Sequence, residues 1–74
     1  MFVRWTDKSG DDVVFDLENI ATLRRRHTEI KAIDVCGETV TTTRTDTVEE
    51  AESMLTRIIN AKSDGVEAFD VNEL

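Results

Sequence analysis

Proline is missing from this chain of 74 residues, and cysteine and glycine are scarce. Cys36 is the only cysteine, so an intrachain disulfide and a zinc site of the usual four-ligand kind are both excluded. We expect Cys36 to be a buried structural residue in a protein of a reducing compartment. The three glycines are scattered at positions 10, 37 and 65, which excludes a glycine-rich phosphate-binding loop.

Long apolar runs are also absent. No stretch approaches the length that crosses a bilayer, and the N-terminal MFVRWTDKSG lacks the apolar core and cleavage site of a secretory signal. We therefore expect a cytoplasmic protein with no membrane partner. A chain this short forms one domain with a small core, and assembly into a homodimer would be a natural reinforcement.

Basic residues are outnumbered, and the imbalance is uneven along the chain. The formal net charge is −7, with sixteen acids and nine bases. Residues 1–44 hold eight acids and seven bases, whereas residues 45–74 hold eight acids and two bases. Because affinity for nucleic acid depends on clustered lysine and arginine, direct nucleic-acid binding is disfavoured. The acidic second part instead suits a protein partner with a basic surface, or simply keeps the domain soluble.

The segment Thr45 to Lys62 has the pattern of an amphipathic helix. Asp46 or Thr47 is placed to accept a hydrogen bond from the first turn, with a glutamate three residues later as in a capping box. Gly65 would end the helix. Apolar residues recur at steps of three and four and would form one core-facing side: Val48, Ala51, Met54, Leu55, Ile58 and Ile59.

The residues before this helix have the pattern of strands joined by turns. Phe2–Thr6 and Val13–Leu17 form one predicted hairpin around the polar turn 7–12, and Trp5 is expected in the core or at a dimer contact. Ile30–Val35 and the threonine-rich Thr39–Arg44 form a second hairpin. The threonine hydroxyls are available to solvent, to cross-strand hydrogen bonds or to a polar ligand.

Residues 18–33 permit two interpretations. Their apolar residues recur at helical steps, which indicates a helix. The run from Thr22 to His27 lacks a clear cap, however, and residues that favour strands continue towards Gly37. We favour a strand for this segment.

These patterns predict an α+β domain over residues 1–65. Its fold would be a small antiparallel sheet of about four or five strands, made of two β-hairpins and packed by one C-terminal amphipathic helix. Residues 66–74 form a C-terminal tail that is either packed on the domain or its dimer mate, or bound to a partner. The tail is too apolar to be idle, since it contains Val66, Phe69, Val71 and Leu74.

The order of these elements resembles the short flagellar FlbD-type (swarming motility) family. The residues that carry the resemblance are Gly10, Val13 to Leu17, Ile20, Gly37 to Val40 and Thr47 to Glu50, with the helix that continues to Ile59. The resemblance implies a strand-rich N-terminal part with a closing helix, no catalytic residue, and an accessory role in flagellar assembly. Small phage proteins with a β-meander and a closing helix are similar in the same way. The arginine triplet, the threonine-rich strand and the tail depart from the family pattern.

One basic cluster is the candidate ligand site. It consists of Arg24, Arg25, Arg26 and His27, which Arg44 and Lys31 could join. Guanidinium groups bind phosphate or carboxylate through paired hydrogen bonds. The residues would either pair with acids of the domain or its dimer mate, or bind a nucleotide-like phosphate in an oligomer that sequesters its ligand.

The candidate partner-binding set is acidic. It consists of Glu49, Glu50, Glu52, Glu67, Phe69 and Asp70. Since no pattern of nucleophile and base, paired carboxylates or metal ligands is present, we expect a non-enzymatic interaction protein without cofactor or metal. A phage-encoded inhibitor that occupies a basic surface of a host defence complex would fit; the alternatives are the ligand-sequestering oligomer and the flagellar accessory factor.

Overall fold

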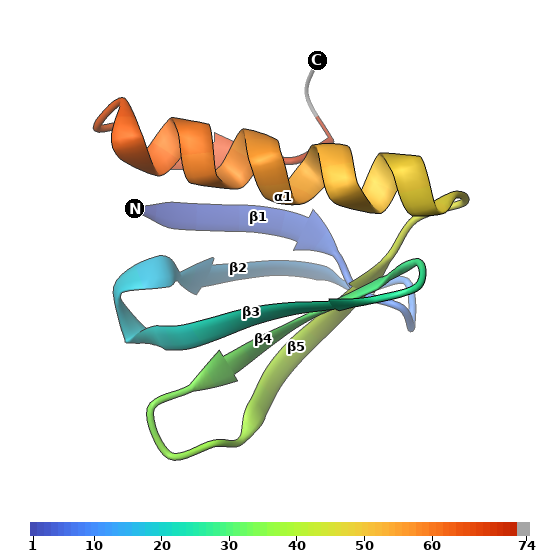
Figure 1. Ribbon diagram of the computed structural model, residues 1–74. Coiled ribbons are helices and arrows are strands. Elements are labelled where there is room, and N and C mark those ends of the chain that lie inside the picture. The colour runs from blue at the N-terminus through green and yellow to red at the C-terminus, as the bar shows by residue number, and fades with distance from the viewer. Residues whose placement is uncertain (73–74) are drawn as a thin grey trace.

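The computed structural model describes residues 1–72. The elements follow in the order β1 (Phe2–Thr6), β2 (Asp12–Asp16), the 3-10 helix η1 (Leu17–Asn19), β3 (Ile20–Arg26), β4 (Glu29–Asp34), β5 (Thr39–Arg44), α1 (Val48–Ser63) and β6 (Ala68–Asp70). The α+β class is confirmed. Figure 1 shows α1 lying along β1, with β2 to β5 curling away beneath it. No helix within residues 1–72 has the length and apolar character needed to cross a membrane.

The strands are distributed over two three-stranded sheets, in the orders β2-β1-β6 and β3-β4-β5. Both predicted hairpins are present, and β6 adds a parallel strand to β1. The sheets meet where β1 ends. Asp7 bridges to Thr43, and the Thr43 hydroxyl donates a hydrogen bond of 2.6 Å to the carbonyl of Thr6. This corner joins the sheets into one curved wall around the core.

Most of residues 18–33 lie in strands, which confirms the strand interpretation of this segment. After η1, β3 and β4 form an antiparallel hairpin whose turn is His27 and Thr28. His27 has a φ of 54°, in the left-handed region that two-residue hairpin turns require at their first position. A residue outside the hairpin stabilises the turn, because the Thr28 carbonyl accepts a hydrogen bond of 2.9 Å from the amide of Thr45. The arginine triplet therefore lies at the end of a strand, beside a tight turn.

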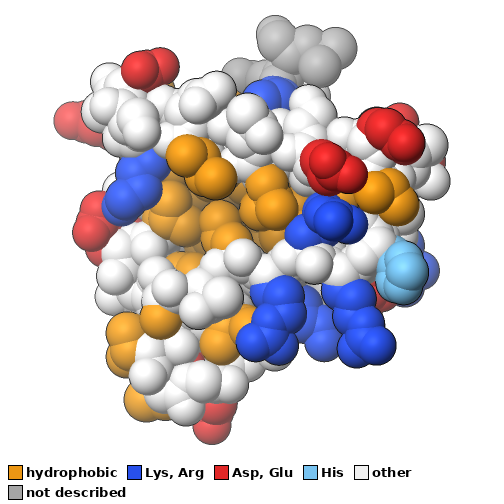
Figure 2. Space-filling view, viewed as in Figure 1, with side chains coloured by type: hydrophobic (Ala, Val, Ile, Leu, Met, Phe, Trp, Pro, Cys, Tyr) orange, Lys and Arg blue, Asp and Glu red, His pale blue; other side chains and the backbone are white. Residues whose placement is uncertain are grey.

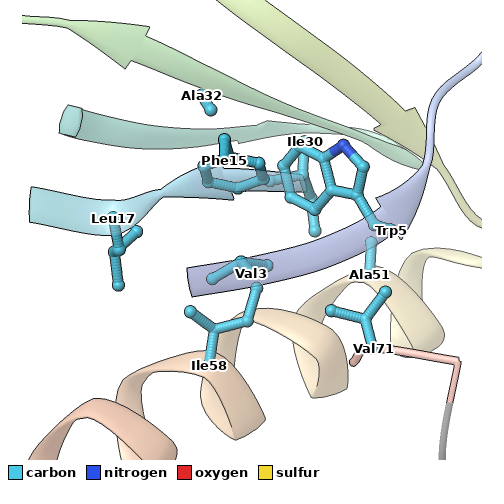
Figure 3. Packing of buried hydrophobic residues seen from close by; sticks show 9 residues of the cluster. All are labelled: Val3, Trp5, Phe15, Leu17, Ile30, Ala32, Ala51, Ile58 and Val71. Atoms are coloured by element: carbon cyan, nitrogen blue, oxygen red, sulfur yellow. The ribbon is translucent and has the colours of Figure 1, made fainter. Parts of the chain in front are cut away.

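The core lies between α1 and the curved wall. Trp5 is fully buried, which confirms its predicted core position, and its ring lies 4.7 Å from that of Phe15 between centroids. The indole nitrogen donates a hydrogen bond of 3.0 Å to the Thr41 hydroxyl. Threonine hydroxyls of β5 thus satisfy core groups. The other members of the cluster, labelled in Figure 3, are Val3, Leu17, Ile30, Ala32, Ala51, Ile58 and Val71.

Helix α1 begins after Thr47, as predicted, because the Thr47 hydroxyl accepts a hydrogen bond of 3.1 Å from the amide of Glu50. Five of the six residues predicted for its core-facing side are buried or half-buried, and Ile59 is the exception. Ala51, Ile58 and Ala61 are buried, whereas Ile59 is 59% exposed. The prediction that Ile59 faces the core is therefore wrong, since the buried stripe of α1 runs through Ala51, Ile58 and Ala61.

The environment of Cys36 also differs from the prediction. The prediction of a buried structural cysteine is wrong, because Cys36 is exposed. It lies in the turn between β4 and β5, where the carboxylate of Asp34 accepts hydrogen bonds from the amides of Cys36 and Glu38. These bonds fix the turn through the backbone and leave the thiol outside the core.

The segment after α1 returns along the sheet. Residues Ala68–Asp70 pair with β1, and the next residue, Val71, is buried beside Ala51 (Figure 3). The guanidinium of Arg57 lies 5.4 Å from the ring centroid of Phe69. This part of the tail is packed on its own chain. Leu74, the last apolar residue of the predicted tail, lies outside the described residues.

Candidate anion-binding site

The hairpin β3–β4 and the neighbouring β5 bring basic residues from separate parts of the sequence together. Because side chains alternate along a strand, Arg24 and Arg26 share the outer side of β3. In the ladder, Arg24 lies opposite Lys31, and Arg26 lies opposite Glu29. Glu29 is in turn opposite Arg44 on β5. Two adjacent rows across the sheet therefore carry four cations and one carboxylate.

These side chains surround a hollow of about 610 Å³. It is lined by Arg24, Arg26, His27, Thr28, Glu29, Lys31 and Arg44. Figure 2 shows lysine and arginine side chains gathered along the lower part of the molecule, with the histidine at their side. The hollow thus has a local charge of +3 in a chain whose formal net charge is −7. We call it the basic hollow.

Among residues 1–72, Arg44 is the one cation of the hollow that forms an ion pair. Arg44 forms an ion pair of 2.7 Å with Glu29. This hydrogen bond is the main reason that the pKa of Glu29 lies below its ordinary value; desolvation opposes it, and the charges of Lys8, Arg44 and Lys31 lower the pKa further. Within residues 1–72, the side chains of Arg24, Arg26 and Lys31 form no hydrogen bond or ion pair.

The opposition of Arg24 and Lys31 is energetically unfavourable in the free protein. Like charges directly across a ladder destabilise a sheet by a few tenths of a kcal/mol up to about 1 kcal/mol. Arg4 on the first sheet is a contrast, because it lies near Asp12 and donates hydrogen bonds to both oxygens of that carboxylate. An anion between Arg24 and Lys31 would convert their repulsion into two attractive contacts.

Of the basic cluster predicted for the ligand site, Arg24, Arg26 and His27 line the basic hollow, together with Arg44 and Lys31, which the sequence suggested could join it. Arg25 points to the other side of β3, opposite Ile30, and donates a hydrogen bond of 3.0 Å to the His27 carbonyl. Thr28 and Glu29 were missed in the sequence. Their position depends on the two-residue turn, which lacks the glycine, asparagine or aspartate that is typical of such turns.

The predicted acidic set is divided in space. Glu49, Glu50 and Glu52 are exposed on the first half of α1. Glu67 is exposed beyond the other end of the helix, just before β6, while Phe69 and Asp70 are half-buried in that strand. A 16-residue helix is about 24 Å long at 1.5 Å per residue. Glu67 therefore belongs to a different part of the surface from the glutamates of α1.

The basic hollow presents groups that bind anions. His27 and Cys36 flank opposite ends of β4, a separation of about 20 Å for six residues at 3.3 Å each, so they cannot act as a nucleophile and base pair. Among residues 1–72, no group of three or more histidine, cysteine, aspartate or glutamate side chains is arranged to hold a metal ion. What the hollow presents is guanidinium and ammonium groups at adjacent positions.

Comparison with protein-family models, curated proteins and solved structures finds no match to this chain. The resemblance to the flagellar FlbD-type family stays a prediction.

Proposed function

We propose that this protein is a non-enzymatic binding protein that holds a compact, phosphate-bearing anion in the basic hollow. The observation that carries the proposal is the opposition of Arg24 and Lys31, two cations that no carboxylate of residues 1–72 pairs. A ligand with several negative charges would relieve this repulsion. An anion could therefore bind favourably in the basic hollow without any rearrangement of the fold.

The spacing of the cations favours a small ligand with more than one negative charge. Neighbouring strands lie about 4.8 Å apart, and alternate residues of a strand about 6.6 Å apart, so Arg24, Arg26 and Lys31 surround a space the size of one or two phosphate groups. Guanidinium groups bind phosphate oxygens in pairs. A nucleoside diphosphate carries such a pair of phosphate groups. A long nucleic acid would instead extend over the acidic remainder of the surface.

The test is isothermal titration calorimetry with pyrophosphate, a nucleoside diphosphate and a single-stranded oligonucleotide. The double variant Arg24→Gln/Lys31→Met removes the two opposed charges and keeps unbranched side chains. We expect at least a tenfold loss of pyrophosphate affinity, equivalent to about 1.4 kcal/mol.

Arg4→Gln is the matched control, because it removes an exposed guanidinium of the other sheet. Equal affinity of the wild type and the double variant, or an equal loss in Arg4→Gln, would show that the basic hollow is not the site. Stronger binding of the oligonucleotide than of pyrophosphate would contradict the preference for a compact anion.

A second candidate function is occupation of a basic protein surface by the first half of α1. It is favoured by one observation: the exposed carboxylates of Glu49 and Glu52 form no ion pair or side-chain hydrogen bond within residues 1–72. An inhibitor of a host defence complex would use such a surface. The triple variant Glu49→Lys/Glu50→Lys/Glu52→Lys should lose a partner captured by the wild type at low salt, and retention of that partner would rule this function out.

A further inference from the structure

Beside its buried stripe, helix α1 carries a second stripe that the domain covers only in part. Leu55 and Ile59 are four residues apart, and Glu52 and Lys62 continue the same stripe at steps of three. This spacing is the 3.5-residue repeat by which helices meet other helices or sheets. Leu55 is half-buried and Ile59 is 59% exposed. Thus α1 has one stripe for the core and another that faces outward.

The last two turns of α1, which include Ile59 and Lys62 of the outward stripe, form one wall of an apolar groove, and Leu17 with residues of β3 forms the other. The groove has a volume of about 430 Å³ and is lined by Leu17, Ile20, Leu23, Ile58 and Ile59, with Lys62 and Ser63 at its end. Figure 2 shows these apolar side chains exposed as one patch between the helix above and the strands below. Ile20 and Leu23 are only half-buried. The groove is therefore an extension of the core that opens to the surface.

The charges at the ends of the groove alternate in sign. At one end Lys62 of α1 forms an ion pair of 3.4 Å with Glu18, which precedes β3. Because α1 and β3 run in opposite directions (Figure 1), the other end is marked by the first half of α1 and the last half of β3. Glu52 lies there on the helix, two turns before Ile59, and Arg25 lies on the strand, on the same side as Leu23.

This alternation makes the groove complementary to itself. A twofold axis along the groove would place Glu52 against the partner's Arg25, and Lys62 against the partner's Glu18. A twofold axis across the groove would place Glu52 against the partner's Lys62, and Ile59 against the partner's Leu55. In both cases apolar surface meets apolar surface and every charge meets its opposite, which is the requirement of an isologous interface.

The outer edge of β3 adds to the same surface. No backbone hydrogen bond other than those of the β4 ladder involves residues 21–26, within the part of the chain that the structure describes. We propose that the groove between α1 and β3 is the interface of a homodimer, covered by a second copy of this chain. This proposal rests on surfaces separate from the basic hollow and is independent of the proposed anion binding; it shares only Glu52 with the second candidate function.

The experiment is sedimentation equilibrium of the full chain, over a concentration range from about 10 μM to about 1 mM. We expect the wild type to approach twice the chain mass of 8.4 kDa. Ile59→Lys should raise the dimer dissociation constant at least about tenfold, because it places a charge in the apolar centre of the interface. Val14→Lys is the control, because Val14 is 58% exposed but lies on the other sheet, on β2.

Charge exchange then identifies the axis. Glu52→Lys alone should weaken the dimer by roughly three- to tenfold at low salt. The double variant Glu52→Lys/Arg25→Glu restores the dimer if the axis runs along the groove, and Glu52→Lys/Lys62→Glu restores it if the axis runs across the groove. A wild type that stays at 8.4 kDa up to the highest concentration, an Ile59→Lys variant that dimerises normally, or failure of both exchanges would overturn the proposal.

Discussion

Arg24 and Lys31 lie directly opposite each other on β3 and β4, so two cations meet on the outer face of the second sheet. Replacing Lys31 with methionine keeps an unbranched side chain and removes this repulsion. We expect the free energy of unfolding to rise by about 0.2–1 kcal/mol at low salt. The gain should shrink in about 1 M salt, where the screening length is about 3 Å. Urea denaturation followed by Trp5 fluorescence measures both values.

The control for that variant is Lys62→Met, which removes a cation that is paired with Glu18. It should not stabilise the protein. A fall in stability of Lys31→Met at low salt would show that the attraction between Lys31 and Glu29 outweighs the repulsion between Lys31 and Arg24.

The buried hydrogen bond between Trp5 and Thr41 gives a second prediction. Thr41→Val leaves the indole N–H of Trp5 without an acceptor and should lower the free energy of unfolding by about 1–3 kcal/mol. Thr39→Val, at an exposed position of the same strand, should change it by less than about 0.5 kcal/mol. Equal effects of the two variants in thermal or urea denaturation would contradict the assignment of this bond.

The fold was predictable where one residue pattern corresponds to one local structure. The alternation of Val13, Phe15 and a buried Leu17 predicted a strand with one covered face, and Thr47 predicted the start of α1. The core position of Trp5 follows from the same alternation. These features depend on residues close to each other in the chain.

The errors arise where tertiary packing decides. Ile59 and Ile58 both fit a broad apolar face in the sequence, and only the direction from which the sheet approaches determines that Ile58 is buried and Ile59 is exposed. Cys36 was assigned from the usual burial of cysteine, although its turn is fixed by the carboxylate of Asp34. The sequence identifies the arginines of the basic hollow. It does not predict that Arg24 lies opposite Lys31 and Arg26 opposite Glu29, because that register follows from a turn at His27 that contains no glycine.

The packing of the segment after α1 gives a third prediction. Val71 is 5% exposed, and its truncation to alanine removes two buried carbon atoms, at about 0.8 kcal/mol each with an added cavity cost. We expect a loss of about 2 kcal/mol in the free energy of unfolding. Val66→Ala, at a residue that is 38% exposed, is the control and should cost less than half as much. An unaffected Val71→Ala variant would show that β6 and its following residue are dispensable for stability.

The ion pair of Glu29 with Arg44 gives a prediction on pH. Because the folded-state pKa of Glu29 is lowered, its contribution to stability is present above the ordinary glutamate pKa of about 4.3 and is lost as the pH falls through the lower folded value. Carbon-13 NMR titration of the Glu29 carboxyl measures this pKa. Arg44→Gln should raise it, and so should pyrophosphate, which adds negative charge beside Glu29 and competes for Arg44. A pKa that pyrophosphate leaves unchanged would place the anion elsewhere.

The central claim is that the unpaired cations of the basic hollow are a binding site for a phosphate-bearing anion. The most direct measurement is thermal denaturation of the wild type and Lys31→Met, at low salt, with and without pyrophosphate. We predict that the wild type starts at the lower midpoint and is stabilised by pyrophosphate, in proportion to RT ln(1 + [L]/Kd), whereas Lys31→Met starts higher and responds little. Equal shifts of the two proteins, or no shift of the wild type, would contradict the claim.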